Sequence, residues 1–412
     1  MILPFVLLLV TIAVMPSFSS NWWSRHYPKV ALGLGAVTLV YYLWFLRSPA
    51  RVAHVAHDYV SFIALIASLY VVSGGIHIHV KGQATPPVNV VFLFLGAFIA
   101  NFLGTTGAAM LLIRPWIRMN RNRIAAHHIV FFIFVVANIG GCLTPIGDPP
   151  LFLGYLQGIP FWWVAEHCWP MWAVGVGLLL AMFYRVDRHH YMGVLPRPGH
   201  RETTAETWRF DGLSNLFFLA VILGAVFVQR PVLLRESLML AAALGSYFTT
   251  SRKVHEANAF HFHPIREVAI LFAGIFATML PALDWLELNA RHLLGPQPSP
   301  AVFYFGTGTL SSVLDNAPTY LSFLSALLGT SGAGEVQGLP GAEPLNLTAI
   351  SISAVFFGAA TYIGNGPNFM VKSIADAQKI CIPTFGIFIW KFTLPFLLPT
   401  LLIVWAAFFC CR

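Results

Sequence analysis

Long apolar segments alternate with short polar segments along nearly the whole chain. A window of about 20 apolar residues is long enough to cross a bilayer as a helix. The first span is expected to be retained, because no basic segment precedes it. The pattern predicts ten full spans, near 1–18, 29–46, 55–73, 128–158, 163–184, 213–228, 232–249, 267–283, 346–371 and 384–409.

Two further apolar stretches, 86–114 and 300–329, follow a different pattern. Each is too long for one upright helix and has small and polar residues at its middle, Gly-Thr-Thr-Gly at 104–107 and Asp-Asn-Ala-Pro-Thr at 315–319. Irregular backbone at membrane depth persists only where protein or a water-filled cavity surrounds it. Both stretches are therefore predicted to be re-entrant hairpins whose tips reach the bilayer centre.

The composition supports a membrane protein. Hydrophobic residues make up 57% of the 412 residues and charged residues only 10%, with a mean hydropathy of +0.73. Soluble proteins carry about 25% charged residues, so most of this surface must face lipid. The expected fold class is an all-α polytopic membrane protein whose main partner is the lipid bilayer. The net charge of +8 does not indicate a nucleic-acid partner, because the basic residues lie between spans, where they set topology.

The basic residues also predict an orientation. If the N-terminus lies outside and each hairpin returns to its own side, most of the 24 Lys and Arg residues face inward, as the positive-inside rule requires. Counting either hairpin as a crossing would place later basic loops on the opposite face. The polar segment 185–212 is then an inward, cytoplasmic linker between two halves, 1–184 and 213–412.

The two halves share one order of elements in opposite orientation. Each has three spans, a hairpin, an interrupted span and a final span, which is the inverted-repeat plan of many secondary transporters. The interrupted spans also share a local sequence. Ile-Gly-Asp-Pro-Pro at 146–150 aligns with Ile-Gly-Asn-Gly-Pro at 363–367, at a constant offset of 217.

Both interrupted spans contain residues that stop and restart a helix. In 128–158, the glycines after Asn138 and the Thr144-Pro145 pair end one helix, and Asp148 followed by Pro149 starts another. In 346–371, Asn365-Gly366-Pro367 repeats the restart. Broken helices leave backbone groups free, and an ion or substrate can bind them.

Oxygen-bearing side chains gather at the two hairpin tips and the two breaks. Such oxygens are the ligands of small hard cations, and a charge at the bilayer centre costs about 2.5–3.5 kcal/mol. We therefore predict a sodium site that uses Asp148 and Asp315, with Na⁺ and H⁺ as transported or coupling ions and no other cofactor. The alternatives are that each acid only caps a helix and that the other residues only join helices. The candidate residues are Asn101, Thr105, Thr106, Asn138, Thr144, Asp148, Asp315, Asn316, Thr319, Thr361, Asn365 and Asn368.

Other polar groups are expected to have structural or interfacial roles rather than a part in binding. The histidine pairs suggest metal binding or pH sensing, but their places at span ends favour interfacial or solvated side chains. Asp58, beside His54 and His57, suits the first turn of a helix, with a proton relay as the alternative. The sequence has no nucleotide-binding or hydrolase motif, so no enzyme activity is expected. The pairs are His77/His79, His127/His128, His189/His190 and His261/His263.

The residues from Asn138 to Pro150, Leu310 to Thr319 and Thr361 to Asn368 resemble motifs of the ion transporter superfamily. That superfamily includes NhaD-type sodium/proton antiporters, arsenite permeases and citrate transporters. The resemblance covers about 50–409 and is nearest to bacterial proteins described as citrate transporters or sodium:proton antiporters. It implies an elevator-type homodimer in the cytoplasmic (inner) membrane. The hairpin tips depart from the Ser-Asn-Thr tips of the dicarboxylate branch, which puts a polyanion substrate in doubt.

Two functions follow from the sequence. Two acids at the breaks, without a nearby cationic side chain, favour sodium/proton antiport. Cation-coupled transport of citrate or another carboxylate is the alternative, with the substrate bound at helix N-termini. Arsenite export and a membrane metalloenzyme built on the histidine pairs are weaker hypotheses.

Overall fold

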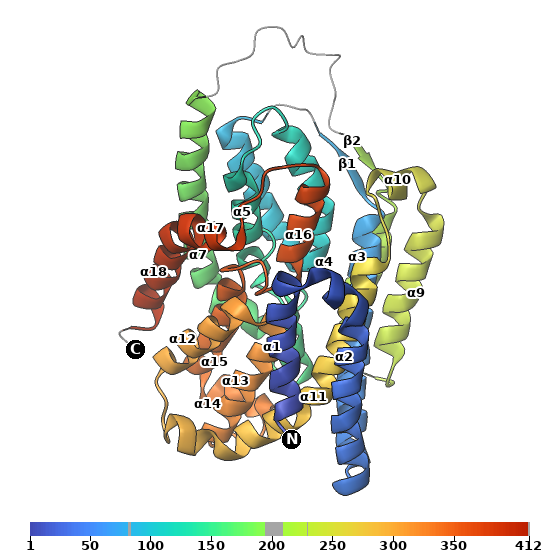
Figure 1. Ribbon diagram of the computed structural model, residues 1–412, viewed down its shortest axis with the longest axis vertical. Coiled ribbons are helices and arrows are strands. Elements are labelled where there is room, and N and C mark those ends of the chain that lie inside the picture. The colour runs from blue at the N-terminus through green and yellow to red at the C-terminus, as the bar shows by residue number, and fades with distance from the viewer. Residues whose placement is uncertain (81–83, 194–208, 229, 411–412) are drawn as a thin grey trace.

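The computed structural model describes residues 1–80, 84–193, 209–228 and 230–410 (Figure 1). The middle of the predicted linker 185–212 lies outside the described residues. Its first part belongs to a helix that continues to Gly193, and its last part contains a short strand. The helix thus continues past the predicted end of the span at 184, because charged residues end the apolar run without ending the helix.

The first half contains one long bent helix and one interrupted helix among straight helices. A π-helical turn, Tyr41–Phe45, extends α2, and a 3₁₀ turn, Ile139–Gly141, follows α5. Its elements are α1 (Leu3–Phe18), α2 (Ser20–Val40), α3 (Pro49–Gly74), β1 (His77–His79), α4 (Pro86–Met119), α5 (Ala126–Val135), α6 (Pro149–Leu156) and α7 (Phe161–Gly193).

The predicted second half contains more and mostly shorter elements. A 3₁₀ turn, Val336–Gly338, precedes α14, and a π-helical segment, Ile389–Leu397, joins its last two helices. Its elements are β2 (Arg209–Asp211), α8 (Asn215–Ala225), α9 (Leu234–Thr249), α10 (Arg252–Ala257), α11 (His263–Leu294), α12 (Pro300–Val313), α13 (Asn316–Thr330), α14 (Leu339–Ala342), α15 (Pro344–Gly358), α16 (Gly366–Ala377), α17 (Phe385–Phe388) and α18 (Leu398–Phe408).

Most of the described chain is helical, and six of its helices are long and apolar enough to cross a membrane. Others, such as α8 and α15, are apolar but shorter than a bilayer requires when upright. The chain is not entirely α-helical. Strands β1 and β2, of three residues each, pair antiparallel with Ile78 opposite Phe210, and the class remains that of an all-α polytopic membrane protein.

Helix α4 is a hairpin, because its two arms fold back at Gly104. Gly104 has a positive φ of 71°, which favours glycine, and it breaks the helix. The Asn89 amide donates a 2.8 Å hydrogen bond to Asn120, and the rings of Phe92 and Trp116 lie 5.4 Å apart. A straight helix would separate Asn89 and Asn120 by about 46 Å. The stretch predicted to turn back at 104–107 does so.

The second hairpin consists of α12 and α13, which meet at Leu314 and Asp315. Leu314 is extended, and Asp315 caps α13 by accepting a 3.0 Å hydrogen bond from the Ala317 N–H. The arms pack against each other, since a Cβ on Gly306 would lie 2.9 Å from the Phe323 ring. Both predicted hairpins thus place their polar residues at the tip.

The two halves interlock through the broken helices. Helix α6 of the first half packs against α13, and α16 of the second half packs against α4 and α5. In Figure 1, the red α16 accordingly lies beside the blue-green helices α4 and α5. Each break is thereby held against a hairpin of the other half.

A second group of helices surrounds α3 and α11, which contact each other. In the first half, α1 packs on α2, and α2 packs on α11. In the second half, α8 packs on α9, and α9 packs on α3. The same relations therefore occur once in each half, as an inverted repeat would require.

Polar contacts at the two ends of the bundle agree with the predicted orientation. Asp58 accepts a 2.8 Å hydrogen bond from Gln157, and both lie near the predicted outward ends of their spans, 55–73 and 128–158. Arg123 pairs with Asp187, and both belong to segments predicted to face inward. Each of these contacts thus joins segments that the charge distribution places on one side.

His77 is buried, so the expectation of a solvated or interfacial side chain was wrong for it. Its Nδ1 lies 2.7 Å from Asn258 Oδ1, and Arg118 Nη1 lies 3.1 Å from its Nε2. Burial lowers the pKa of His77, which leaves it neutral, with one nitrogen donating to Asn258 and the other accepting from Arg118. It is a structural residue at the start of strand β1.

Candidate ion-binding site

Asp148 lies at the centre of the molecule, where the first broken helix restarts. It has extended backbone at the N-cap of α6, and Pro149 occupies the first helical position. Its side chain does not cap the helix by a hydrogen bond. The residue is completely buried, so its carboxylate is directed to the interior rather than to α6, and the interpretation of Asp148 as a mere cap does not fit the geometry.

Three neutral side chains donate hydrogen bonds to this carboxylate. Thr105 Oγ1 lies 2.7 Å and Asn365 Nδ2 3.1 Å from Oδ1, and Asn316 Nδ2 lies 2.5 Å from Oδ2. Thr105 comes from the first hairpin tip, Asn316 from the second tip, and Asn365 from the second break. The four interruptions thus meet at one carboxylate, and its hydrogen-bond partners among the described residues include no lysine or arginine.

An asparagine network joins the two breaks. Asn138 Nδ2 lies 2.6 Å from Asn368 Oδ1, and Asn365 Nδ2 also lies 3.1 Å from Asn138 Oδ1. The Asn368 amide donates to the carbonyls of Gly358 and Thr361, at 2.8 and 2.9 Å. These amides satisfy backbone carbonyls that the broken helix leaves free. They fix Asn365 in contact with Asp148.

Two threonines fasten the breaks to the hairpins in equivalent ways. Thr144 Oγ1 donates to the Asn101 carbonyl and Thr361 Oγ1 to the Ser312 carbonyl, each at 2.6 Å. Each hydroxyl also accepts an N–H three residues later, from Gly147 at 3.1 Å and Gly364 at 3.2 Å. This repeated contact supports alignment of the two halves.

Asn101 closes the first of these junctions. Its amide donates to the Gly140 carbonyl at 2.8 Å, and its Oδ1 accepts from the Leu143 N–H at 2.9 Å. The Thr105 N–H donates to the Gly147 carbonyl at 2.8 Å. Hydrogen bonds therefore join the tip of the first hairpin to the first break on both sides of Gly104.

The remaining predicted residues lie around this centre in other roles. Asp315 is partly exposed and caps α13, and Thr319 Oγ1 donates to its carbonyl at 2.9 Å. The capping interpretation therefore describes the contact that Asp315 makes. Thr106 is half-buried and lines a small pocket instead of contacting Asp148.

One buried oxygen beside Asp148 has no hydrogen-bond partner among the described residues. Asn316 donates through Nδ2, but its Oδ1 is buried and unpartnered. Leaving a buried polar atom unpaired costs about 1–3 kcal/mol. A proton donor or a cation at this position would supply the missing partner.

A pocket of about 20 Å³ adjoins the first hairpin tip. A single water needs about 10–15 Å³ of such space, so the pocket has room for one water-sized species. Its polar lining is Thr105 and Thr106, and an apolar wall comes from α3. This wall was missed from the sequence, because its helical spacing is also that of an ordinary core. The wall comprises Phe62, Leu65, Ile66 and Leu69.

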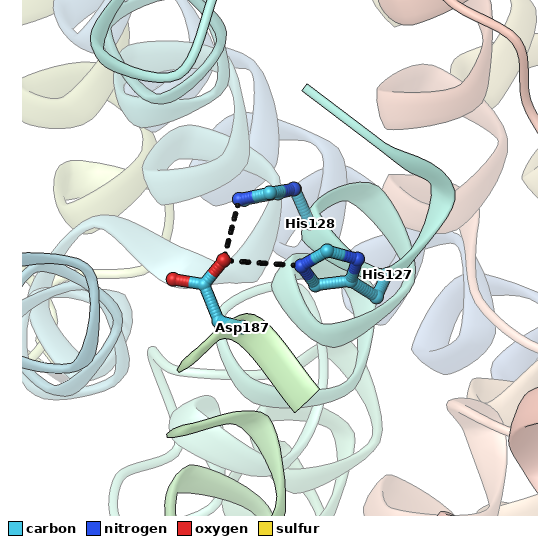
Figure 2. Close-up of side chains that lie close together, drawn as sticks. All are labelled: His127, His128 and Asp187. Carbon is cyan, nitrogen blue, oxygen red and sulfur yellow. Dashed lines mark hydrogen bonds and ion pairs between the residues drawn. The ribbon is translucent and has the colours of Figure 1, made fainter. Parts of the chain in front are cut away.

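A separate polar cluster lies between α5 and α7, at the end predicted to face inward (Figure 2). The Nε2 atoms of His127 and His128 each lie 3.1 Å from Asp187 Oδ1. All three residues are buried, so the expectation of solvated or interfacial histidines was also wrong here. Asp187 lies 60 residues from His127 in sequence, which is why spacing along the chain could not reveal it.

This cluster is a hydrogen-bonded ion pair. Arg123 donates to both oxygens of Asp187, and Asn89 Nδ2 donates to Oδ2 at 3.0 Å. The Ala125 N–H donates to His128 Nδ1 at 3.2 Å, which leaves Nε2 to carry the proton of a neutral ring. The His128 Nε2 lies 3.1 Å from Asp187 Oδ1 without the geometry of a hydrogen bond, whereas His127 Nε2 makes one at the same distance. A metal would need a lone pair at the His128 nitrogen. The cluster joins the base of hairpin α4 to α5 and α7.

Replacing Arg123 by lysine should lower the free energy of unfolding by about 1–2 kcal/mol, because an ammonium cannot reproduce the guanidinium fork on both carboxylate oxygens. Thermal unfolding of the detergent-solubilised protein measures this loss. The exposed Arg252 provides a control, since Arg252→Lys should leave stability unchanged. Equal melting temperatures for Arg123→Lys and Arg252→Lys would show that the fork does not stabilise this end.

The fold and the buried site are those of a polytopic helical membrane transporter. Comparison with known proteins agrees, because the model of the family described as "Putative citrate transport" matches residues 1–409. The chain belongs to this family.

Curated relatives have general names. A "46 kDa membrane protein" of Mycobacterium leprae is 23% identical over 331 residues, which cover 76% of this chain and 74% of the relative. An "uncharacterized transporter" of Mycobacterium tuberculosis is 24% identical over 336 residues, with the same coverage, as is one of Mycobacterium bovis.

Proposed function

We propose that this protein is a sodium/proton antiporter of the elevator type in the cytoplasmic membrane. The observation that carries the proposal is the buried Asp148 carboxylate, which neutral donors from both hairpin tips and the second break hold in place. A lone buried carboxylate requires a positive partner, and a transported cation can supply it.

Sodium and protons would compete for the same oxygens. With Na⁺ bound, the carboxylate, Thr105 Oγ1 and the unpartnered Asn316 Oδ1 offer oxygen ligands of the type that small hard cations take. With a proton bound, the carboxyl becomes neutral and keeps hydrogen bonds to the same neighbours. The empty site carries a negative charge in a low-dielectric interior, so its movement across the membrane is disfavoured. Exchange is then obligatory.

The architecture supports this mechanism. Halves 1–184 and 213–412 form the inverted repeat, with re-entrant hairpins 86–114 and 300–329 and about ten full spans. The helices around the breaks, α4–α7 and α12–α18, form the moving part, and α1–α3 with α8–α11 form the scaffold. Exposed apolar side chains on the π-helical turn after α2 and on α9, such as Trp44 and Phe248, face lipid or a second copy in a homodimer.

A second candidate is cation-coupled transport of citrate or another carboxylate. The description of the family favours it. The pocket at the first hairpin tip is lined by Thr105, which bonds Asp148, and its size favours a single ion, because citrate is far larger than a water molecule. Asp148 itself would also repel a free polyanion.

The experiment is a flux panel in proteoliposomes with Na⁺, Li⁺, K⁺, citrate and arsenite. We expect an imposed pH gradient to drive Na⁺ uptake without citrate or arsenite. Citrate uptake that requires Na⁺ or H⁺, without exchange of Na⁺ for H⁺ in its absence, would reject antiport in favour of the second candidate.

Thr105→Val should weaken the apparent Na⁺ affinity about tenfold, because it removes one oxygen ligand and one hydrogen bond to the carboxylate while keeping the shape. The concentration of Na⁺ that gives half-maximal flux measures this. Thr249→Val, on an exposed face of α9, is the control and should match the unmodified protein. An unchanged half-maximal Na⁺ concentration in Thr105→Val would show that the hairpin tip does not contribute to Na⁺ binding.

A further inference from the structure

Four acidic side chains are buried in the described part of the chain: Asp58, Asp148, Asp187 and Glu236. Burying an unpaired carboxylate is costly, so such groups normally have a cationic partner or a function. Arg123 pairs with Asp187, and Arg235 pairs with Glu236 and donates to Ser61 at 2.8 Å. Asp148 belongs to the candidate site. Asp58 remains without an arginine or lysine among its ion-pair partners.

The basic neighbours of Asp58 are imidazoles that reach solvent. His54 Nε2 lies 3.6 Å from Oδ2 and His57 Nδ1 lies 3.9 Å from Oδ1. The Asp58 side chain is 8% exposed, whereas those of His54 and His57 are 58% and 36% exposed. A further charged group near it is Arg235, which pairs with Glu236.

Asp58 also lies at the outer end of the helices that form the pocket. On α3 it is one turn from Phe62, which begins the apolar wall of the pocket. Its hydrogen-bond partner Gln157 directly follows α6, and Asp148 occupies the N-cap position at the opposite end of that helix. The 8 residues of α6 span about 12 Å. The two unpaired acids therefore lie at opposite ends of one short helix, with the pocket beside it.

We propose that Asp58, with His54 and His57, is a second proton-binding site through which protons pass between the outward solvent and Asp148. An imidazolium N–H transfers its proton to the Asp58 carboxylate, which leaves a neutral imidazole and a neutral carboxyl. The carboxyl then releases the proton toward Asp148 by way of the pocket between Phe62, one turn from Asp58, and Thr105, which bonds Asp148. This inference rests on the proposed antiport. The competing role is structural, with Asp58 only holding the end of α6 through Gln157.

Asp58→Asn separates these roles, because an asparagine oxygen still accepts the hydrogen bond from Gln157 but cannot carry a proton. We expect proton-coupled Na⁺ flux to fall at least about tenfold and to lose its dependence on external pH. Na⁺ binding at Asp148, measured by calorimetry, should be unchanged. Gln157→Ala should keep the pH dependence, since the carboxylate remains. His261→Gln, on an exposed inward residue, is the matched control.

The double variant His54→Gln/His57→Gln tests the site without altering a buried residue. It should flatten the response to external pH even if Asp58→Asn folds poorly. Normal flux and pH response in Asp58→Asn, or a normal response in the histidine variant, would overturn the inference, and so would loss of the pH response in Gln157→Ala. If the unmodified protein shows no exchange of Na⁺ for H⁺, the proposed antiport itself has failed.

Discussion

Asp148→Asn is expected to abolish sodium/proton exchange, with a loss of at least about 100-fold in flux. The substitution keeps the size of the side chain but removes the charge that binds Na⁺ and the group that takes up the proton. Removing one charged partner from a buried pair costs about 3–5 kcal/mol, and each 1.4 kcal/mol is a factor of about ten. Proteoliposome flux at saturating Na⁺ measures the loss.

Folding must be checked separately for this variant. Asp148 accepts hydrogen bonds from Thr105, Asn316 and Asn365. An asparagine at this position would place its own N–H donors against these donor groups. Size-exclusion chromatography and thermal unfolding show whether the variant stays folded. Asp376→Asn, at an exposed acid paired with Lys372, should keep full flux. A folded Asp148→Asn variant with normal exchange would remove the carboxylate from the mechanism.

Gly147→Ala is expected to prevent normal folding, because the two sides of the first break cross at this glycine. An added Cβ would lie 2.0 Å from the Gly141 carbonyl oxygen, which is backbone and cannot rotate away. Overpacking a tight interior costs about 1–3 kcal/mol and occasionally more. In the second half, Gly358 and Gly364 form the equivalent crossing. A Cβ on Gly364 would lie 2.6 Å from the Gly358 carbonyl oxygen, whereas a Cβ on Gly358 would have more space.

The measurement is the yield of monodisperse protein and its melting temperature. Gly177→Ala is the control, since a Cβ there meets nothing within 4 Å and alanine favours a helix. We expect Gly177→Ala to be neutral or slightly stabilising. If Gly147→Ala folds with the same melting temperature, the break does not have the close crossing described here.

Local chemistry made the breaks and hairpin tips predictable. The glycines and prolines around Asp148 and Asn365 cannot continue a helix, and Gly104 supplies a backbone conformation that other residues rarely adopt. These signals act over a few residues, so the sequence contains them directly. The oxygen-bearing side chains at the four interruptions were identified for the same reason.

Contacts between distant segments could not be read from the sequence. Asp148 meets Asn316 and Asn365 across 168 and 217 residues, and only packing of one half against the other decides which polar residues touch. The same limit explains why Asp315, an equally conspicuous acid, caps its own helix while Asn316 reaches Asp148. It also explains the missed partnership of Asp187 with His127.

Hydropathy was a poor guide to helix length. Helix α7 continues through charged residues to Gly193, because a helix can extend beyond the lipid into water. Helix α8 has only 11 residues, although the apolar run predicted a full span at 213–228. Apolar residues report contact with lipid or core, and the helix ends are set by capping and packing.

The most direct test of the central claim is calorimetric titration of Na⁺ into the purified protein at a series of pH values. If Na⁺ and a proton compete for Asp148, each bound Na⁺ releases one proton at low pH. The apparent affinity then falls toward tenfold per pH unit as the carboxyl becomes protonated. Na⁺ binding that is independent of pH, or that persists unchanged in Asp148→Asn, would contradict the account.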